Sequence, residues 1–140
     1  MDVILKMLLT KECDYGVRII RVLADGEKRT VQTISEAEHI PLKYTYKIIK
    51  KLEKVGLVKS IRGIHGGYVL VKNLEEFSLL DIVASIDKKL VLNECLLPDA
   101  QCQRNNPDAP CNVHQELGRI QSVLVTELLS KNMTQVLFPK

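Results

Sequence analysis

Residues 42–68 decide the fold, and they read LKYTYKIIKKLEKVGLVKSIRGIHGGY. Over residues 42–55, apolar side chains recur at the spacing of one helical face, and lysines take the other side at about 100° per residue. The apolar stripe consists of Ile48, Ile49, Leu52 and Val55, and the basic side consists of Lys43, Lys47, Lys50, Lys51 and Lys54. We therefore expect a helix that packs on one face and presents ammonium groups on the other. Gly56 is well placed to end it in a left-handed conformation.

Beyond Gly56 the period becomes that of strands. Residues 57–62 and 68–72 are β-prone runs on either side of the glycine-rich segment 63–67. Such a tip needs backbone dihedrals that glycine adopts easily, so the pattern predicts a β-hairpin.

Upstream of the basic helix, the sequence predicts two shorter helices. Apolar residues recur at helical spacing over residues 10–24, and an Asp-Gly turn follows. Thr30 can cap a second helix that runs toward His39. Pro41 ends this helix, because the residue before a proline is excluded from the α region.

Downstream of the hairpin, Ser78 and Asp81 have the spacing of a capping box for a helix through Ile86. Three of the five prolines then fall within residues 94–111, which predicts a loop. A last apolar stripe at helical spacing consists of Val113, Leu117, Ile120, Leu124 and Leu128. In a chain of 140 residues this stripe has little left to pack on, so we expect a partner subunit to cover it.

The predicted fold class is mainly α with a small β-hairpin: a winged helix-turn-helix domain plus a long C-terminal dimerisation helix. The expected parts are a DNA-binding domain over residues 8–90, a cysteine-containing cluster-binding loop over 91–112 and the dimerisation helix over 113–134.

The charge distribution points to a polyanion. Residues 41–65 carry seven Lys/Arg and one acid, a net charge of +6, whereas the rest of the chain carries −3. A basic segment on an acidic body is the electrostatic footprint of a nucleic-acid-binding face. A helix of this width fits the major groove of B-DNA, and a hairpin can reach an adjacent groove. The expected DNA-binding residues are Lys43, Tyr44, Tyr46, Lys47, Lys50, Lys51, Arg62, His65, Gly66 and Gly67.

Three cysteines gather in the predicted loop. Cys95, Cys102 and Cys111 have the spacing C-x6-C-x8-C, and His114 follows the last of them by three residues. Zinc sites usually contain a tighter cysteine pair, so zinc is the minority interpretation. Open spacing on a loop favours an iron–sulfur cluster, which needs a fourth ligand.

The fourth ligand has two candidates. His114 is the local one, and Asp14 from a partner subunit is the remote one. Cys13 stands apart from the loop, and we expect it to be a small packed side chain.

The chain also resembles a known family over nearly its whole length. The matching residues are Leu9-Thr10, Tyr15-Gly16-Val17, Lys51-Leu52, Gly56-Leu57-Val58, Arg62-Gly63, Gly66-Gly67-Tyr68, Ser78-Leu79 and Ile82. With the spaced cysteines, this string resembles the winged-helix bacterial regulators that include the iron–sulfur assembly regulator IscR and the nitric-oxide sensor NsrR.

The resemblance implies a homodimer in which the long helix crosses the partner and the cluster loop lies near the interface. IscR-like members hold a 2Fe–2S cluster with three cysteines and a histidine, which implies His114. NsrR-like members hold a 4Fe–4S cluster with an aspartate from the other subunit, which implies Asp14. The cysteine gaps of this chain are longer than in either pattern. Other relatives, such as the cysteine-metabolism repressor CymR, have no cluster.

The functional hypothesis is therefore a homodimeric transcription regulator, a repressor at a palindromic operator in double-stranded DNA. Its DNA affinity would depend on an iron–sulfur cluster (2Fe–2S favoured, 4Fe–4S the alternative) that senses iron, redox or nitric oxide status. One alternative is a cluster-free regulator of sulfur or cysteine metabolism that responds to a small molecule or a partner protein. The less favoured alternative is a thiol enzyme with Cys111 as nucleophile and His114 as base, although no orienting third group accompanies the pair.

Composition supports a globular protein without a membrane partner. The apolar fraction is 46% and the charged fraction 26%, and no apolar run reaches the length of a membrane span. The opening stretch Met1–Leu9 is short, mixes acid and base and lacks a signal-peptide cleavage pattern. We therefore expect the protein to act in the cytoplasm, where thiols are kept reduced.

Overall fold

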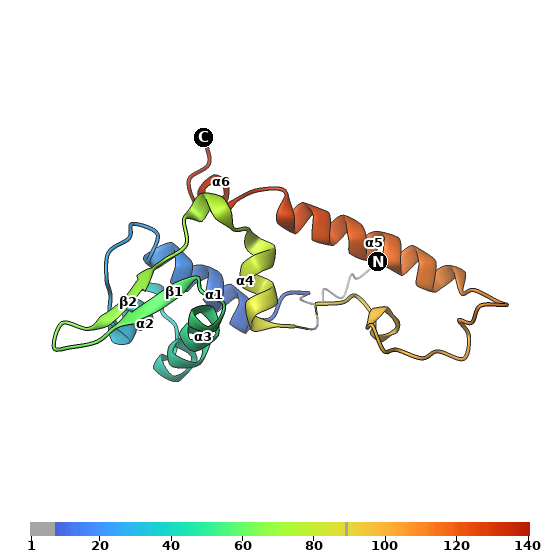
Figure 1. Ribbon diagram of the computed structural model, residues 1–140, viewed down its shortest axis with the longest axis horizontal. Coiled ribbons are helices and arrows are strands. Elements are labelled where there is room, and N and C mark those ends of the chain that lie inside the picture. Colours follow the sequence, from blue (N-terminus) through green and yellow to red (C-terminus); the bar gives the residue numbers. More distant parts are fainter. Residues whose placement is uncertain (1–7, 89) are drawn as a thin grey trace, which may run out of the picture.

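The computed structural model describes residues 8–88 and 90–140 (Figure 1). The expectation that Met1–Leu9 neither spans a membrane nor acts as a signal falls almost wholly outside these residues. Among the residues that are described, no helix is both long enough and apolar enough to cross a membrane.

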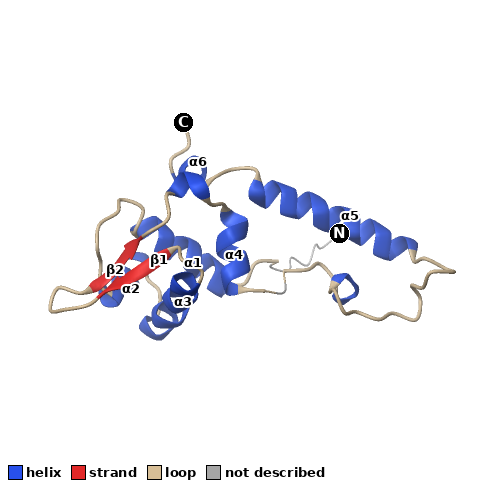
Figure 2. Ribbon diagram, in the orientation of Figure 1, coloured by secondary structure: helices blue, strands red, loops and turns tan. Residues whose placement is uncertain are grey.

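The chain is mainly helical with one antiparallel hairpin, as predicted (Figure 2). Along the chain the elements are α1 (Lys11–Val22), α2 (Val31–Glu38), α3 (Leu42–Lys54), β1 (Val58–Ile61), β2 (Gly67–Leu70), η1 (Leu74–Glu76), α4 (Leu79–Ile86), η2 (Glu94–Leu96), α5 (Asn112–Leu129) and α6 (Met133–Leu137).

Local capping chemistry sets the helix ends where the sequence predicted them. The hydroxyl of Thr30 accepts a hydrogen bond from the backbone N–H of Thr33 at 3.1 Å, which caps α2. Ser78 and Asp81 form the predicted capping box at the start of α4. Gly56 follows α3 with a φ of 80°, a conformation that glycine adopts without strain.

The core lies where α1, α3 and α4 meet. Ile19 and Ile20 of α1 and the predicted stripe residues Ile48, Ile49 and Leu52 of α3 are fully buried there. The stripe does not extend to Val55, which is 52% exposed, so that part of the prediction is wrong. The helix ends at Lys54, and the chain turns so that Leu57, bonded through its N–H to the carbonyl of Leu52 at 3.1 Å, fills the core position instead.

An ion pair fixes α2 against α1. The Arg21 guanidinium donates two hydrogen bonds to the Glu38 carboxylate, and Arg18 donates to the Glu38 backbone carbonyl at 3.1 Å. The next residue, His39, takes the left-handed conformation with a φ of 54°. The turn at His39 ends α2 and is followed, after Ile40 and Pro41, by the start of α3.

The wing, defined as β1, β2 and the tip of residues 62–66 between them, is anchored at its base. Arg29 pairs with Tyr68 through two backbone hydrogen bonds of 2.9 and 2.7 Å, which adds a short bridge to β2. A Cβ at Gly67 would lie 2.6 Å from the Arg29 carbonyl oxygen, and one at Gly66 would lie 2.6 Å from that of Ile61. The backbone packing of the wing therefore requires glycine at both positions.

The C-terminal region differs from the single helix predicted over residues 113–134. Helix α5 ends at Leu129, and Asn132 forms a capping box that starts the separate helix α6. The N–H of Met133 bonds to the Phe77 carbonyl at 2.9 Å, and the Met133 side chain is fully buried in the hydrophobic core. The end of the chain thus returns to the helical body, which the predicted domain boundaries did not anticipate.

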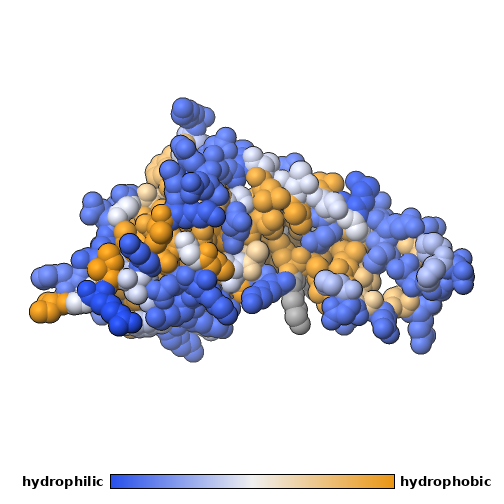
Figure 3. Space-filling view, viewed as in Figure 1, coloured by the Kyte–Doolittle hydropathy of each residue, from blue (hydrophilic) through white to orange (hydrophobic). Residues whose placement is uncertain are grey.

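Helix α5 and the cysteine loop (residues 91–111) extend together from this body (Figure 1). Gln121 of α5 holds the start of the loop by donating to the Leu90 carbonyl at 2.8 Å and accepting from the Leu92 N–H at 2.9 Å. No residue of α5 is buried, and Val113, Ile120, Val123 and Leu129 are exposed. Figure 3 shows a hydrophobic band over α4 and the neighbouring end of α5.

The return of the chain end gives a stability prediction. Replacing Met133 by Ala should lower the free energy of unfolding by about 2–5 kcal/mol, because truncation of this buried side chain leaves a cavity between α6 and the core. Urea unfolding followed by circular dichroism measures the change. Val71→Ala, at an exposed position, should change it by less than about 0.5 kcal/mol and serves as the control. Equal stability of M133A and the parent would contradict the docking of α6.

Candidate nucleic-acid interface and cysteine loop

The solvent side of α3 carries the predicted basic row. Lys43, Lys47, Lys50 and Lys54 are exposed, and so is Tyr46, with 52% of its surface accessible. The buried isoleucines on the opposite side of α3 determine which way this row faces. The arrangement presents cations and one aromatic hydroxyl on a single helix face.

Two lysines of this helix contact the same acid of α1, Glu12, and Lys50 Nζ lies 3.6 Å from Glu53 Oε1 of its own helix. Lys47 Nζ lies 2.7 Å from Glu12 Oε1, and Lys51 Nζ lies 3.7 Å from Glu12 Oε2. The hydrogen bond from Lys47 lowers the pKa of Glu12 below its usual value, and the same bond raises the pKa of Lys47. The sequence pattern predicts Lys47 and Lys51 on a free basic face. The structure corrects this, because Glu12 of α1 partly neutralises the face.

Lys51 also differs from the other lysines in position. It is only partly exposed, and its ammonium group donates to the backbone carbonyl of Ile86 at 3.2 Å. Ile86 is the last residue of α4, where orphan carbonyls attract cations. In the DNA-free protein Lys51 therefore joins α3 to the end of α4 instead of pointing to solvent.

Tyr44 lies in the packing between α1 and α3. It contacts the core, its ring centroid is 5.8 Å from that of Tyr15, and Lys43 Nζ lies 5.3 Å from the centre of its ring. This position counts against the expectation that Tyr44 reaches base edges, and it leaves Tyr46 as the exposed aromatic residue of the helix. The sequence pattern could not separate the two, because both follow polar neighbours.

Two side chains of α3 fix the wing relative to the basic row. Glu53 accepts a hydrogen bond from the Ser60 N–H at 3.0 Å, and this contact lowers the pKa of Glu53. Lys50 Nζ lies 5.8 Å from the centre of the Tyr68 ring, and its interaction with the Tyr68 hydroxyl raises the pKa of Lys50. A pocket of about 420 Å³ lies between α2, Tyr46 and the wing.

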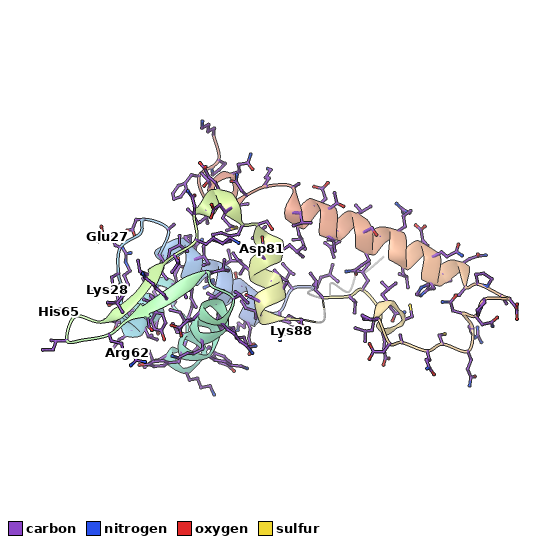
Figure 4. All side chains as sticks on the ribbon, viewed as in Figure 1. Glu27, Lys28, Arg62, His65, Asp81 and Lys88 are labelled. Atoms are coloured by element: carbon purple, nitrogen blue, oxygen red, sulfur yellow. The ribbon has the colours of Figure 1, made fainter. Side chains whose placement is uncertain are left out.

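The wing tip extends away from the body, with Arg62 and His65 at its end and Glu27 and Lys28 on the neighbouring loop (Figure 4). Arg62 and His65 are exposed. The recognition surface, which we define as the exposed side of α3 together with the wing, thus has cations on both of its parts.

The cysteine loop forms a second, separate site. Cys95, Cys102 and His114 line one cavity of about 480 Å³. Cys111 lies at the N-terminus of α5, where its Sγ accepts from the His114 N–H at 3.5 Å. The Cys111 N–H in turn donates to the Asn105 side chain at 2.9 Å, which ties the loop to the helix.

The loop cysteines and His114 are the residue types that bind an iron–sulfur cluster, but their side chains lie too far apart to hold one in this conformation. Nδ1 of His114 is buried without a hydrogen-bond partner, in a residue that lines the cavity of two cysteines. Such an atom is costly unless a ligand or metal satisfies it. No group of three or more His, Cys, Asp or Glu side chains within residues 8–88 and 90–140 is close enough together to hold a metal ion. A cluster would therefore require the loop to close around it.

The other candidate ligand and the fourth cysteine are apart from this loop. Asp14 lies on α1, half exposed, with Arg18 at 2.9 Å from its carboxylate. Cys13 is buried in the core, as expected for a small packed side chain.

The contacts of Cys111 and His114 do not support the alternative in which they act as nucleophile and base of a thiol enzyme. The bond between them comes from the backbone N–H of His114, not from its imidazole. A nucleophile–base pair would need the imidazole to reach the thiol.

Sequence reasoning missed three residues that organise these sites: Glu12, Arg29 and Gln121. Each acts on a segment distant in sequence, so no local pattern marks it. For Glu12 the usable signal is its place as an acid in the first turn of α1, in a chain whose third helix is rich in lysine.

The fold and the recognition surface together define a winged helix-turn-helix transcription regulator, a DNA-binding protein. The chain belongs to the Rrf2 family, described as iron-dependent transcriptional regulators, whose family model matches residues 9–138. This confirms the resemblance drawn from the sequence.

Individual relatives agree with this class. A Haemophilus influenzae protein, named as an HTH-type transcriptional regulator, is 39% identical over 93 residues, which are 64% of this chain and 62% of that protein. The fold matches T. potens IscR with a TM-score of 0.69 at 24% identity, over 95% of this chain and 86% of the other. It also matches CymR of B. subtilis, titled the global cysteine regulator, with a TM-score of 0.72 at 23% identity, over 96% and 97% of the two chains.

Glu12 gives a test of the recognition surface. Replacing Glu12 by Gln should raise the affinity for duplex DNA about 2–5-fold at low salt, because Lys47 and Lys51 lose an internal competitor for phosphate. Fluorescence anisotropy with a labelled duplex measures it. Glu116→Gln removes the same charge from an ion pair with Arg119 on α5 and should leave the affinity nearly unchanged. An E12Q protein that binds no better than E116Q would contradict the competition.

Proposed function

We propose that the protein is a homodimeric repressor in the cytoplasm that binds a palindromic operator through two copies of the recognition surface. The observation that carries the proposal is the exposed row of lysines on α3, held beside a basic wing in a chain of the Rrf2 family. Near the start of α3, where a recognition helix meets base edges, the proposed base contacts are Lys43, Tyr46 and Lys47. Lys50, Lys54 and the wing residue Arg62 are placed for phosphates.

We propose that the second subunit binds on α5. Helix α5 buries none of its residues and exposes apolar side chains along 18 residues. We propose that this face packs on the same face of a second copy, which would set the separation of the two recognition helices. Half-sites of a dimeric regulator lie about 34 Å apart, one turn of DNA.

We further propose that the cysteine loop holds an iron–sulfur cluster through Cys95, Cys102 and Cys111. His114 would complete a 2Fe–2S site, and Asp14 of the partner subunit would complete a 4Fe–4S site instead. Zinc on the same cysteines is the minor alternative. When bound, such a cluster supplies iron that reacts with oxygen or nitric oxide and that is lost when iron is scarce.

Contacts of the described residues connect this loop to the DNA-binding face. Gln121 fastens residues 90 and 92 to α5, and α5 in turn contacts α4. At the end of α4 the Ile86 carbonyl accepts the hydrogen bond from Lys51 of α3. A change in loop conformation would therefore act on α3 through α4, and a bias of a few kcal/mol would switch operator occupancy.

A cluster-free regulator of sulfur or cysteine metabolism is the second candidate. It is favoured by the structural similarity to CymR of B. subtilis and by the open arrangement of the loop ligands. In that case a small molecule or a partner protein would meet the loop cysteines or a pocket lined by Tyr15 of α1, Tyr44 of α3 and Ile86 of α4.

The DNA assignment is tested by charge reversal on α3. Lys47→Glu with Lys50→Glu should lower operator affinity at least a hundredfold, because one cation proposed for base edges and one proposed for phosphates become repulsive to DNA in each subunit. Binding is measured at fixed salt to a duplex selected from a randomised pool. The matched control, Lys131→Glu with Lys140→Glu, makes the same charge change at exposed positions away from α3. Unchanged binding by the K47E/K50E protein would refute the placement of the recognition helix.

The cluster is tested by its absorbance and iron content after anaerobic purification. Wild-type protein should show visible bands, and Cys102→Ala should lose them. For a 2Fe–2S site with His114, His114→Ala should also lose them and Asp14→Ala should keep them, and the reverse pattern would assign Asp14. Colourless wild-type protein that still binds DNA would establish the cluster-free alternative.

A further inference from the structure

The wing tip carries an apolar side chain in an unusual place. Ile64 is 99% exposed, more than any other large hydrophobic residue in the described part of the chain. Single exposed hydrophobics are common, but few are fully solvated at the extreme end of a projecting hairpin. Figure 3 shows hydrophobic atoms at this end, with hydrophilic residues next to them.

The backbone holds this side chain outward. The Gly66 N–H bonds to the Gly63 carbonyl at 3.0 Å, so Ile64 and His65 are the two central residues of a closed turn. Gly63 has a φ of 118°, which a side chain at that position would oppose. The tip is therefore a defined turn with Ile64 exposed at one of its two central positions.

The base of the wing is equally fixed. The backbone pairing of Arg29 with Tyr68 holds one strand, and the bond from Ser60 to Glu53 ties the other strand to α3. The position of the tip relative to the recognition helix is thus set before DNA arrives, which lowers the ordering cost of binding.

The neighbours of Ile64 identify the kind of partner. Arg62 and His65 flank it on the tip, and Lys59 and Lys28 are exposed on the adjacent strand and loop. Glu27 is exposed beside Lys28, so the apolar residue has mainly cations and one acid around it. This combination suits a ligand with anionic edges and an apolar interior, which is the chemistry of a DNA groove. Proteins that enter the minor groove often insert Ile, Leu, Phe or Met between base pairs and bend the duplex.

We infer that Ile64 is an apolar wedge that enters the minor groove beside each half-site, partly unstacks one base step and bends the DNA. Arg62 and His65 hold the phosphates on either side of the opened step. Because pyrimidine–purine steps unstack most easily, Ile64 gives the protein a preference for TA or CA steps at positions that α3 does not touch. This inference rests on the proposed function and adds a specificity-determining residue to it.

The test uses the full-length protein and a duplex of about 30 base pairs selected from a randomised pool by the wild type. Fluorophores on the two ends report bending by energy transfer, and 2-aminopurine at the flanking step reports unstacking. Ile64→Ala should lower affinity about tenfold and abolish most of the bend and of the 2-aminopurine signal. Ile64→Leu should retain both. Val71→Ala, exposed just beyond β2, should behave as the wild type.

Each outcome is decisive. If I64A bends and unstacks the duplex as the wild type does, the wedge is refuted while the proposed function stands. If I64A changes only the oligomeric state, measured by light scattering, the tip contacts protein and the inference is also refuted. If the wild type selects no duplex at all, the proposed function fails and this inference fails with it.

Discussion

The packing of one face of α3 against α1 is the constraint on which the rest of the structure depends. Ile48, Ile49 and Leu52 are fully buried, so α3 cannot rotate without exposing them to water. Because the lysines alternate with these residues at helical spacing, burying one face determines the direction of the other. The wing follows from the same packing, since Glu53 and Lys50 at the far end of α3 contact it.

Charge within the protein modifies this simple arrangement. Glu12 lies between Lys47 and Lys51, and it keeps part of the basic face neutral while no DNA is bound. Partial neutralisation lowers the attraction to any polyanion and leaves more of the affinity to contacts that depend on sequence. Lys51 has a different place from the other lysines, because its bond to the Ile86 carbonyl makes it a connection between α3 and α4. The same residue type thus has two uses on one helix.

Much of the fold followed from local pattern, and the failures have physical causes. The caps at Thr30 and Ser78 and the glycine at the end of α3 are set by neighbouring residues, so the sequence predicts them well. The exposure of Val55 and the separate α6 depend on how the chain turns after a helix ends, which periodicity does not report. The burial of Met133 depends on a contact with Phe77, more than 50 residues away.

The candidate sites divide in the same way. The basic row and the three cysteines were evident from composition and spacing, whereas the roles of Glu12 and Gln121 arise only from tertiary contacts. The partly buried position of Tyr44 against the core, in contrast to the exposed Tyr46, likewise required the structure. Spacing alone could not show that His114 lines the cavity of Cys95 and Cys102 with a nitrogen that has no partner.

The central claim is that the lysine face of α3 binds the phosphates of duplex DNA. The most direct measurement is the dependence of the association constant on salt, with the selected duplex and wild-type protein between low and physiological potassium chloride. With at least two phosphate contacts from each subunit of a dimer, log K should fall linearly with log [KCl] with a slope of about −3.6 or steeper. A slope near zero would mean that these ammonium groups do not displace counterions from DNA, and it would contradict the account.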